Sequence, residues 1–154
     1  GEAMKIIYDR GAVPFWYQYF QWQPNLPEAM IKGNEDLWVR HFFGREIAKG
    51  TIAPQAIDEY VRCYRIEHTP ATAASYYRTM REDQKRWATL GGIKQAMPTL
   101  YIHGSKDPVI IPENLHHIEE CFASIKIESL EAGHFVQEEK PREVAALINQ
   151  FFSL

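Results

Sequence analysis

Apolar residues recur at helical spacing through most of the first 90 residues of this 154-residue chain. The segments 37–43, 55–66 and 71–90 repeat apolar positions every three or four residues, and prolines lie between them. This spacing is typical of amphipathic helices that bury one face. We therefore predict that residues 1–91 form a mostly helical region that resembles a cap on a second part of the protein.

The pattern changes after the two adjacent glycines at positions 91 and 92. Short apolar runs now alternate with helical spacing, and prolines mark the expected helix starts. The predicted elements are a strand over 99–103, a helix from Pro112 to about 122, a strand over 125–130 and a helix from Pro141. A strand–helix–strand unit of this length implies two parallel strands joined by a crossover. The fold class is therefore α/β, with a β-α-β-α unit over residues 92–154 after the helical region.

Polar residues follow both predicted strands. The first strand leads into His103-Gly104-Ser105-Lys106-Asp107-Pro108-Val109, and the second leads into Ala132-Gly133-His134. The loops at the carboxyl ends of parallel strands meet at one edge of the sheet, so Asp107 and His134 should lie close together. A histidine that is oriented by an aspartate is a general base in many hydrolases. We therefore identify Asp107 and His134 as a candidate catalytic pair.

Two tyrosine-containing sequences in the helical region make this assignment more specific. Tyr17-Gln18-Tyr19-Phe20-Gln21-Trp22-Gln23-Pro24 and Ser75-Tyr76-Tyr77-Arg78 resemble the two cap motifs of epoxide hydrolases. The tail from Pro98 to Phe152 is similar to the last part of the α/β-hydrolase fold. The resemblance begins near Ala12 and implies a truncated α/β-hydrolase fold, made of the cap and the last strands. In that family one tyrosine from each motif donates a hydrogen bond to the epoxide oxygen, which implies this role for Tyr17 and Tyr77.

The resemblance also implies a sequence of chemical steps. Opening an epoxide places negative charge on its oxygen, and a phenol with a pKa of about 10 can donate to that oxygen while neutral at pH 7. A carboxylate nucleophile forms an ester with the opened ring, and His134, oriented by Asp107, activates the water that hydrolyses this ester. Related fluoroacetate dehalogenases have His and Trp where this chain has Tyr17 and Gln18, which favours an epoxide over an organohalide.

The nucleophile itself is not expected in this chain. The family uses an aspartate on a strand-to-helix turn and a His-Gly-x-Pro loop, both in an N-terminal half before the cap. Among the aspartates only Asp107 follows a convincing strand, and neither Gly-x-Ser-x-Gly nor Gly-x-Cys-x-Gly occurs. We therefore expect an epoxide hydrolase-like fragment that is inactive alone. Two alternatives stay open: one subunit of a split hydrolase, or a non-catalytic oligomeric module that binds a small apolar epoxide-like ligand.

Two parallel strands alone form a poor sheet with bare edges. We therefore expect self-association into a homodimer or higher oligomer, or pairing with a separate chain that carries the nucleophile half.

Composition and charge argue against nucleic-acid binding, membrane spanning and metal binding. A net charge of −3 gives no general attraction to nucleic acid, and no apolar run approaches the roughly 20 residues that cross a membrane. We expect no cofactor and no metal, because His116 and His117 are adjacent and would point about 100° apart on a helix.

The two cysteines, Cys63 and Cys121, are expected to be reduced thiols of a cytoplasmic protein. One helix face carries Arg78, Arg81, Lys85 and Arg86, and we expect this face to be solvated.

Overall fold

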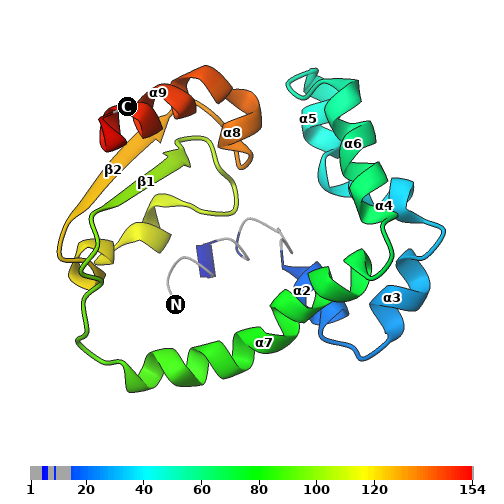
Figure 1. Ribbon diagram of the computed structural model, residues 1–154, viewed down its shortest axis with the longest axis horizontal. Helices are drawn as coiled ribbons and strands as arrows, with labels where there is room; N and C mark the ends of the chain where they lie inside the picture. The colour runs from blue at the N-terminus through cyan, green and yellow to red at the C-terminus, as the bar shows by residue number, and fades with distance from the viewer. Residues whose placement is uncertain (1–4, 7–8, 10–14, 154) are drawn as a thin grey trace. The chain divides into compact units, whose positions relative to one another are not determined.

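The computed structural model describes residues 5, 6, 9 and 15–153. Its contacts divide the chain into two compact units, Phe15–Leu90 and a second unit that contains Gly91–Leu154 (Figure 1). The start of the predicted helical region and of the family resemblance, before Phe15, lies outside the described residues apart from positions 5, 6 and 9.

The helices of the first unit follow the apolar spacing of the sequence. They are α2 (Trp16–Gln21), α3 (Leu26–Ile31), α4 (Glu35–Phe42), α5 (Gly44–Lys49), α6 (Pro54–Tyr64) and α7 (Thr69–Thr89). Helices α3, α6 and α7 carry a proline in their first turn, where a missing backbone N–H costs no hydrogen bond. The predicted helices over 37–43, 55–66 and 71–90 are confirmed to within two residues, whereas the short helices α3 and α5 were not predicted.

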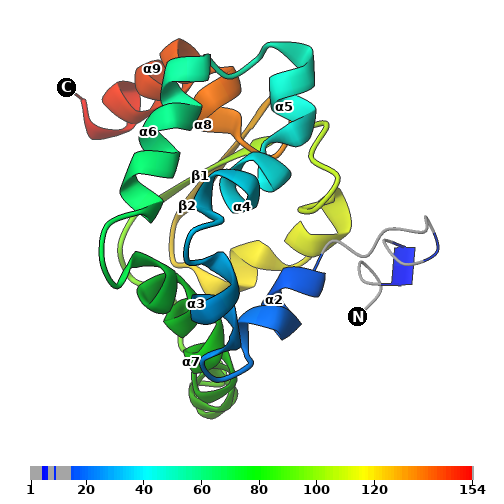
Figure 2. The same ribbon diagram turned by 90° about the vertical axis from the view of Figure 1, so that its right-hand side faces the viewer.

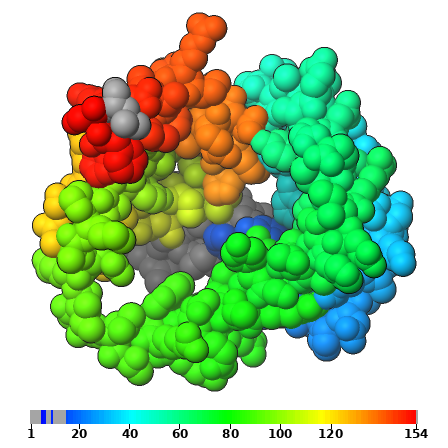
Figure 3. Space-filling view, viewed as in Figure 1, coloured from blue at the N-terminus to red at the C-terminus, as the bar shows by residue number. Residues whose placement is uncertain are grey.

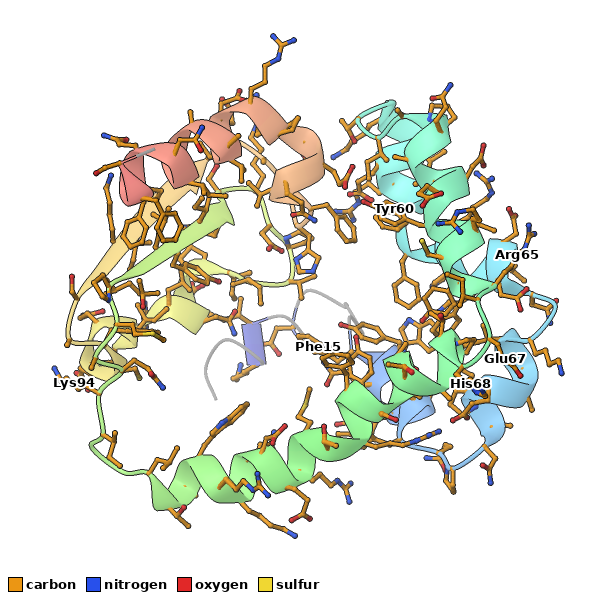
Figure 4. The ribbon with its side chains drawn as sticks, in the orientation of Figure 1. Phe15, Tyr60, Arg65, Glu67, His68 and Lys94 are labelled. Carbon is orange, nitrogen blue, oxygen red and sulfur yellow. The ribbon has the colours of Figure 1, made fainter. Side chains whose placement is uncertain are left out.

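Helices α4 and α6 enclose the core of the first unit. Val39, Ile52, Ile57 and Val61 are each at most 4% exposed, and Trp38, Phe43, Tyr60 and Tyr64 pack against them. After α6 the chain turns through Glu67 and His68 into α7 (Figure 4). His68 precedes α7 with a left-handed φ of 68°, a conformation that is uncommon for residues other than glycine.

Arg78 fastens α7 to the end of α2 and to α3. Its Nε donates to the carbonyl oxygen of Gln21 at 3.1 Å, and its Nη2 donates to that of Gln23 at 2.7 Å. Its Nη1 and Nη2 also donate to the two carboxylate oxygens of Glu28, at 2.6 and 3.0 Å. The guanidinium of Arg78 holds the pKa of the Glu28 carboxyl below its usual range. Arg78 therefore joins α7 to the end of α2 and to α3, and we call this set of hydrogen bonds the Arg78 clasp.

A second contact between α2 and α7 involves the indole of Trp22. Trp22 Nε1 donates to the carbonyl oxygen of Tyr77 at 2.6 Å, and the guanidinium of Arg81 lies 4.5 Å from the Trp22 ring centroid. The expectation of a solvated face is wrong for Arg78, because its guanidinium binds groups on α3 and at the end of α2. Arg81 is exposed as expected, although its guanidinium lies over the Trp22 ring. Lys85 and Arg86 are exposed as expected.

The C-terminal part of α7 presents apolar side chains to solvent. Trp87 is 62% exposed and Leu90 is 47% exposed. In Figure 3 this part of α7 is coloured green and lies on the face of the molecule that is turned toward the viewer. Nothing in the first unit covers the apolar residues at this end of the helix.

The second unit is built on two parallel strands, β1 (Thr99–Gly104) and β2 (Ile125–Leu130). Thr99 pairs with Ile125 at one end, and Gly104 pairs with Leu130 at the other. The register places the last residue of each strand at the same level, so the loops that follow begin side by side. Both strands and the predicted α/β fold class are confirmed.

The connection between the strands differs from its prediction. A single helix from Pro112 to about 122 was expected, but the structure has two short 3₁₀ helices, η1 (Pro112–Leu115) and η2 (Ile118–Cys121). His117 separates them with a left-handed φ of 64°, which ends any regular helix. Its imidazole Nδ1 lies 2.8 Å from Glu120 Oε1, a local contact that accompanies this turn.

Two helices follow β2. They are the single turn α8 (Val136–Glu139) and α9 (Pro141–Phe152), and α9 runs alongside the strand pair (Figures 1 and 2). The apolar face of α9 is only partly covered: Val144, Leu147 and Phe151 are half-buried, whereas Ile148 and Phe152 are 40% and 64% exposed. Within the described residues, no helix is both long and apolar enough to span a membrane.

Candidate functional site

Asp107 lies in the loop after β1 and is held by hydrogen bonds on both carboxylate oxygens. Its Oδ1 accepts the backbone N–H groups of Val109 at 2.7 Å and Ile110 at 3.0 Å. Its Oδ2 lies 2.9 Å from Nδ1 of His134, and the aspartate side chain is only 5% exposed. The backbone donors fix the carboxylate so that one oxygen is left for the histidine.

His134 lies in the loop after β2, and its side chain is 38% exposed. An ionised carboxylate can only accept, so the contact with Asp107 requires the proton of the neutral ring to be on Nδ1. The second ring nitrogen, Nε2, then carries a lone pair that can take a proton from water. Phe135 packs edge-on against the imidazole, with 5.2 Å between the ring centroids. The predicted pair is thus formed in the geometry of a general base and its orienting acid.

A close approach of two backbone segments brings the two loops together. Ser105 N donates to Leu130 O at 2.8 Å, and Lys106 N donates to Ala132 O at 2.9 Å. A Cβ atom on Gly104 would lie 2.0 Å from the carbonyl oxygen of Gly133, a distance that no side chain can adopt. Only glycine therefore fits at the end of β1 where the His134 loop crosses it.

Tyr101 lies on β1, close enough to Asp107 to feel its negative charge. Burial raises the pKa of the Tyr101 phenol, and the negative charge of Asp107 adds to the effect. Its ring stacks on that of His103, two residues further along the strand, with 6.0 Å between the centroids.

The two cap tyrosines lie together in the first unit. Tyr17, from α2, and Tyr77, from α7, have ring centroids 5.5 Å apart and ring planes at 81°. Tyr17 also packs edge-on against Phe42, with 5.2 Å between the centroids. Burial, helped by the neighbouring Tyr17 and Tyr64, raises the pKa of Tyr77. A raised pKa keeps the phenol neutral, so Tyr77 remains a hydrogen-bond donor across the physiological pH range.

A pocket of about 400 Å³ opens beside Tyr77 within the first unit. Its lining residues are Gln21, Tyr64, Ala73, Tyr76, Tyr77 and Met80. Gln21 is 3% exposed, and its side-chain Oε1 has no hydrogen-bond partner among the described residues. An unpaired buried carbonyl costs free energy, so Gln21 marks a locally unfavourable position next to the pocket.

Neither the cysteines nor the histidines form a further cluster in the part of the chain that the structure describes. Cys63 and Cys121 are free thiols. No group of three or more His, Cys, Asp or Glu side chains there could hold a metal ion.

The structure brings the predicted residues together in two pairs: Asp107 with His134, and Tyr17 with Tyr77. Their catalytic roles remain predictions. Sequence reasoning missed Gln21 and Glu139, although both lie inside the segments that resemble the family. Glu139 Oε1 accepts the backbone N–H of Gly133 at 2.9 Å, and its position five residues after His134 was the available signal.

Comparisons with known proteins show what the chain as a whole is similar to. No family model matches the chain. The chain is 25% identical over 170 residues to epoxide hydrolase A of Mycobacterium tuberculosis, covering 90% of this chain and 52% of that protein. It therefore spans about half the length of this curated relative.

Solved structures give the same coverage. An epoxide hydrolase from Bacillus megaterium, solved as a point mutant in complex with its product, a naphthyloxy-propane-1,2-diol, matches with a TM-score of 0.72 and 25% identity; the match covers 91% of this chain and 51% of that one. ALR0039 from Nostoc, an α/β-hydrolase-fold protein, matches with a TM-score of 0.72 and 27% identity, over 95% and 53% of the two chains.

Proposed function

From its correspondence to the C-terminal half of epoxide hydrolases of the α/β-hydrolase fold, we propose that this chain supplies two parts of an epoxide-hydrolysing site. The first part is a water-activating pair, Asp107 and His134. The second is a pair of hydrogen-bond donors, Tyr17 and Tyr77. The contact of 2.9 Å between Asp107 Oδ2 and His134 Nδ1 is the observation that carries the proposal.

The acid–base pair suits the hydrolytic step. The Nδ1 proton is held by Asp107, so Nε2 is free to remove a proton from water as the water attacks an ester carbonyl. The resulting imidazolium is stabilised by the same carboxylate, which is fixed by Val109 and Ile110. The exposed ring of His134 leaves room for water to approach.

The tyrosine pair suits the ring-opening step. Two neutral phenols can donate hydrogen bonds to the epoxide oxygen and stabilise the negative charge that develops on it. Tyr77 also lines the pocket of about 400 Å³, a volume within the usual range for small-molecule sites. Because tyrosine rings, Ala73 and Met80 form most of its wall, we propose that the pocket takes the apolar substituent of a small epoxide.

The covalent step needs a nucleophile that the described aspartates do not provide. Asp9 is an exposed partner of Lys5, Asp36 and Asp58 are paired with Arg40, and Asp83 lies within α7. Asp107 is the one described aspartate that follows a strand, and it binds His134. We propose that an aspartate on another polypeptide segment, from the N-terminal half of the fold, attacks the epoxide carbon.

The second unit offers a place where another segment can associate. Within the described residues β1 pairs along its length only with β2, so its other edge has no strand beside it. An unpaired strand edge is a template for a further strand. We propose that β1 pairs either with the nucleophile half or with a second copy of this chain.

The test combines this chain with the nucleophile-bearing half of a relative, such as the M. tuberculosis epoxide hydrolase A, by coexpression. We expect no styrene oxide turnover by the isolated chain and turnover by the combined protein. His134→Ala should lower turnover by about 10²–10⁴ and trap the ester on the partner aspartate, visible as added mass. Tyr17→Phe and Tyr77→Phe should slow ester formation instead, by about 10²–10³ each.

His116→Ala provides the matched control, because His116 is an exposed histidine outside the pair. Turnover that survives His134→Ala unchanged would contradict the role of the pair. Turnover by the isolated chain that is lost in His134→Ala would instead show that the nucleophile lies within these residues.

A further inference from the structure

Glu139 makes a contact that the proposed chemistry does not use. It ends α8, the single helical turn that follows His134, and this turn is closed by hydrogen bonds from Glu138 N and Glu139 N to Phe135 O at 2.9 and 3.0 Å. The turn folds the glutamate back toward the residue before the histidine. There, Glu139 Oε1 accepts the backbone N–H of Gly133 at 2.9 Å.

We propose that Glu139 is a positioning residue that sets the orientation of the His134 ring toward Asp107. The inference rests on the proposed function, because it assigns Glu139 a role through the proposed base. A hydrogen bond from an amide to a carboxylate is stronger than one between neutral groups, so it restrains the backbone at Gly133. Since His134 follows directly, this restraint fixes the point from which its side chain departs.

Gly133 is held from two sides. Its carbonyl oxygen lies against Gly104, where even a Cβ atom would be 2.0 Å away, and its N–H binds Glu139. A Cβ atom on Gly133 would itself lie 2.8 Å from Glu139 Oε1. Gly133, the residue before His134, is therefore held between the end of β1 and the end of α8. Asp107, which sits on the β1 side, and His134 are then held at a fixed separation.

Glu139 Oε1 is occupied by the backbone N–H of Gly133, so in this proposal Glu139 acts through His134 and not on substrate. An amide side chain can replace the carboxylate as an acceptor for Gly133, whereas alanine cannot. Comparing Glu139→Gln with Glu139→Ala therefore distinguishes the effect of the hydrogen bond from the effect of the negative charge. Replacement of Gly133 by alanine perturbs the same contact from the other partner, because the added Cβ displaces the flexible carboxylate.

The experiment observes the Nδ1 proton of His134 by NMR in the full chain, where no turnover is needed. In the unaltered protein this proton should give a low-field resonance that exchanges slowly with water, owing to the bond to Asp107. Glu139→Gln should keep the resonance. Glu139→Ala and Gly133→Ala should speed its exchange by about tenfold or more, the factor that one hydrogen bond to a charged group is worth.

Glu131→Ala is the control, because Glu131 lies in the same loop but pairs with Lys106 at the surface, at 2.6 Å. It should leave the exchange rate unchanged. An exchange rate in Glu139→Ala equal to that of the unaltered protein would overturn the inference, as would a loss of the resonance in Glu139→Gln equal to that in Glu139→Ala. Failure of the proposed function would appear separately, as turnover that is insensitive to His134→Ala.

Discussion

Trp22 donates its indole N–H to the carbonyl oxygen of Tyr77, with 2.6 Å between the two atoms. The bond links the residue after α2, the helix that carries Tyr17, to the backbone of the other cap tyrosine. Arg78, the next residue, binds Gln21 and Gln23 on the same stretch of chain. These contacts explain why an arginine follows the tyrosine in Ser75-Tyr76-Tyr77-Arg78: Arg78 holds the two tyrosine-bearing helices together.

The Arg78 clasp should contribute substantially to stability. Arg78→Ala leaves two carbonyl groups and the Glu28 carboxylate without their donor, so we expect a loss of about 2–4 kcal/mol in the free energy of unfolding. Arg78→Lys should recover little, since an ammonium cannot form the same set of bonds. Urea unfolding checks both values, with Arg86→Ala as an exposed control. A loss in Arg78→Ala no larger than in Arg86→Ala would contradict the clasp.

Gly104→Ala should be severely destabilising. The new Cβ would meet the backbone oxygens of Gly133 and Ala132 at 2.0 and 2.4 Å, and backbone atoms cannot move aside as a side-chain end can. We expect a loss of at least about 3 kcal/mol or failure to fold. Gly44→Ala, where nothing lies within 4 Å of the added atom, is the control and should fold normally. Equal thermal stability of the two variants would show that the loops are further apart than described.

Asp107→Asn should change the tautomer of His134. The asparagine amide can present a donor where the carboxylate accepted, which favours the neutral ring with its proton on Nε2. Nitrogen chemical shifts of the imidazole report the tautomer directly. We expect Nδ1–H in the unaltered chain and a shift toward Nε2–H in Asp107→Asn. Identical spectra would mean that the hydrogen bond does not select the tautomer.

Tyr77 should make stability fall at alkaline pH. Its pKa is raised in the folded chain, so above the ordinary value of about 10 the unfolded chain loses this proton first. The free energy of unfolding then decreases as the pH rises through and above 10. Tyr77→Phe should reduce this slope, whereas Tyr76→Phe, at a neighbouring site that is 77% exposed, should leave it unchanged. Melting temperatures measured from pH 8 to 11 decide between these outcomes.

Gln21→Met should stabilise the chain. The substitution removes a buried carbonyl that lacks a partner and keeps a side chain of similar length, so we expect a gain of about 1–3 kcal/mol. Gln23→Met, at an exposed position two residues later, should change stability by less than about 0.5 kcal/mol. A destabilised Gln21→Met would show that the amide has a partner in solution.

The strands and the acid–base pair were predictable because their signals are local. Apolar runs that end in glycine and polar residues define β1 and β2, and parallel pairing then dictates that Asp107 and His134 meet. The connecting helix was mispredicted for an equally local reason. His117 has a left-handed backbone, and the sequence there lacks the glycine or asparagine that usually indicates this conformation.

Other features depend on partners that no periodicity reveals. Arg78 sits on α7 with the spacing of a solvated face, and only the fold brings the end of α2 within its reach. Glu139 is similar, since a four-residue helix must form before its carboxylate can reach Gly133.

The pairing of β1 with β2 also limits which lengths can vary around the proposed catalytic pair, Asp107 and His134. Gly104 pairs with Leu130, so Asp107 stands three positions beyond the paired level and His134 four positions beyond it. A residue advances the chain by roughly 3.3 Å in an extended segment, which is more than a hydrogen bond of 2.9 Å can absorb. Natural insertions and deletions should therefore be confined to the crossover, and the lengths of these two short loops should be the least variable part of the second unit.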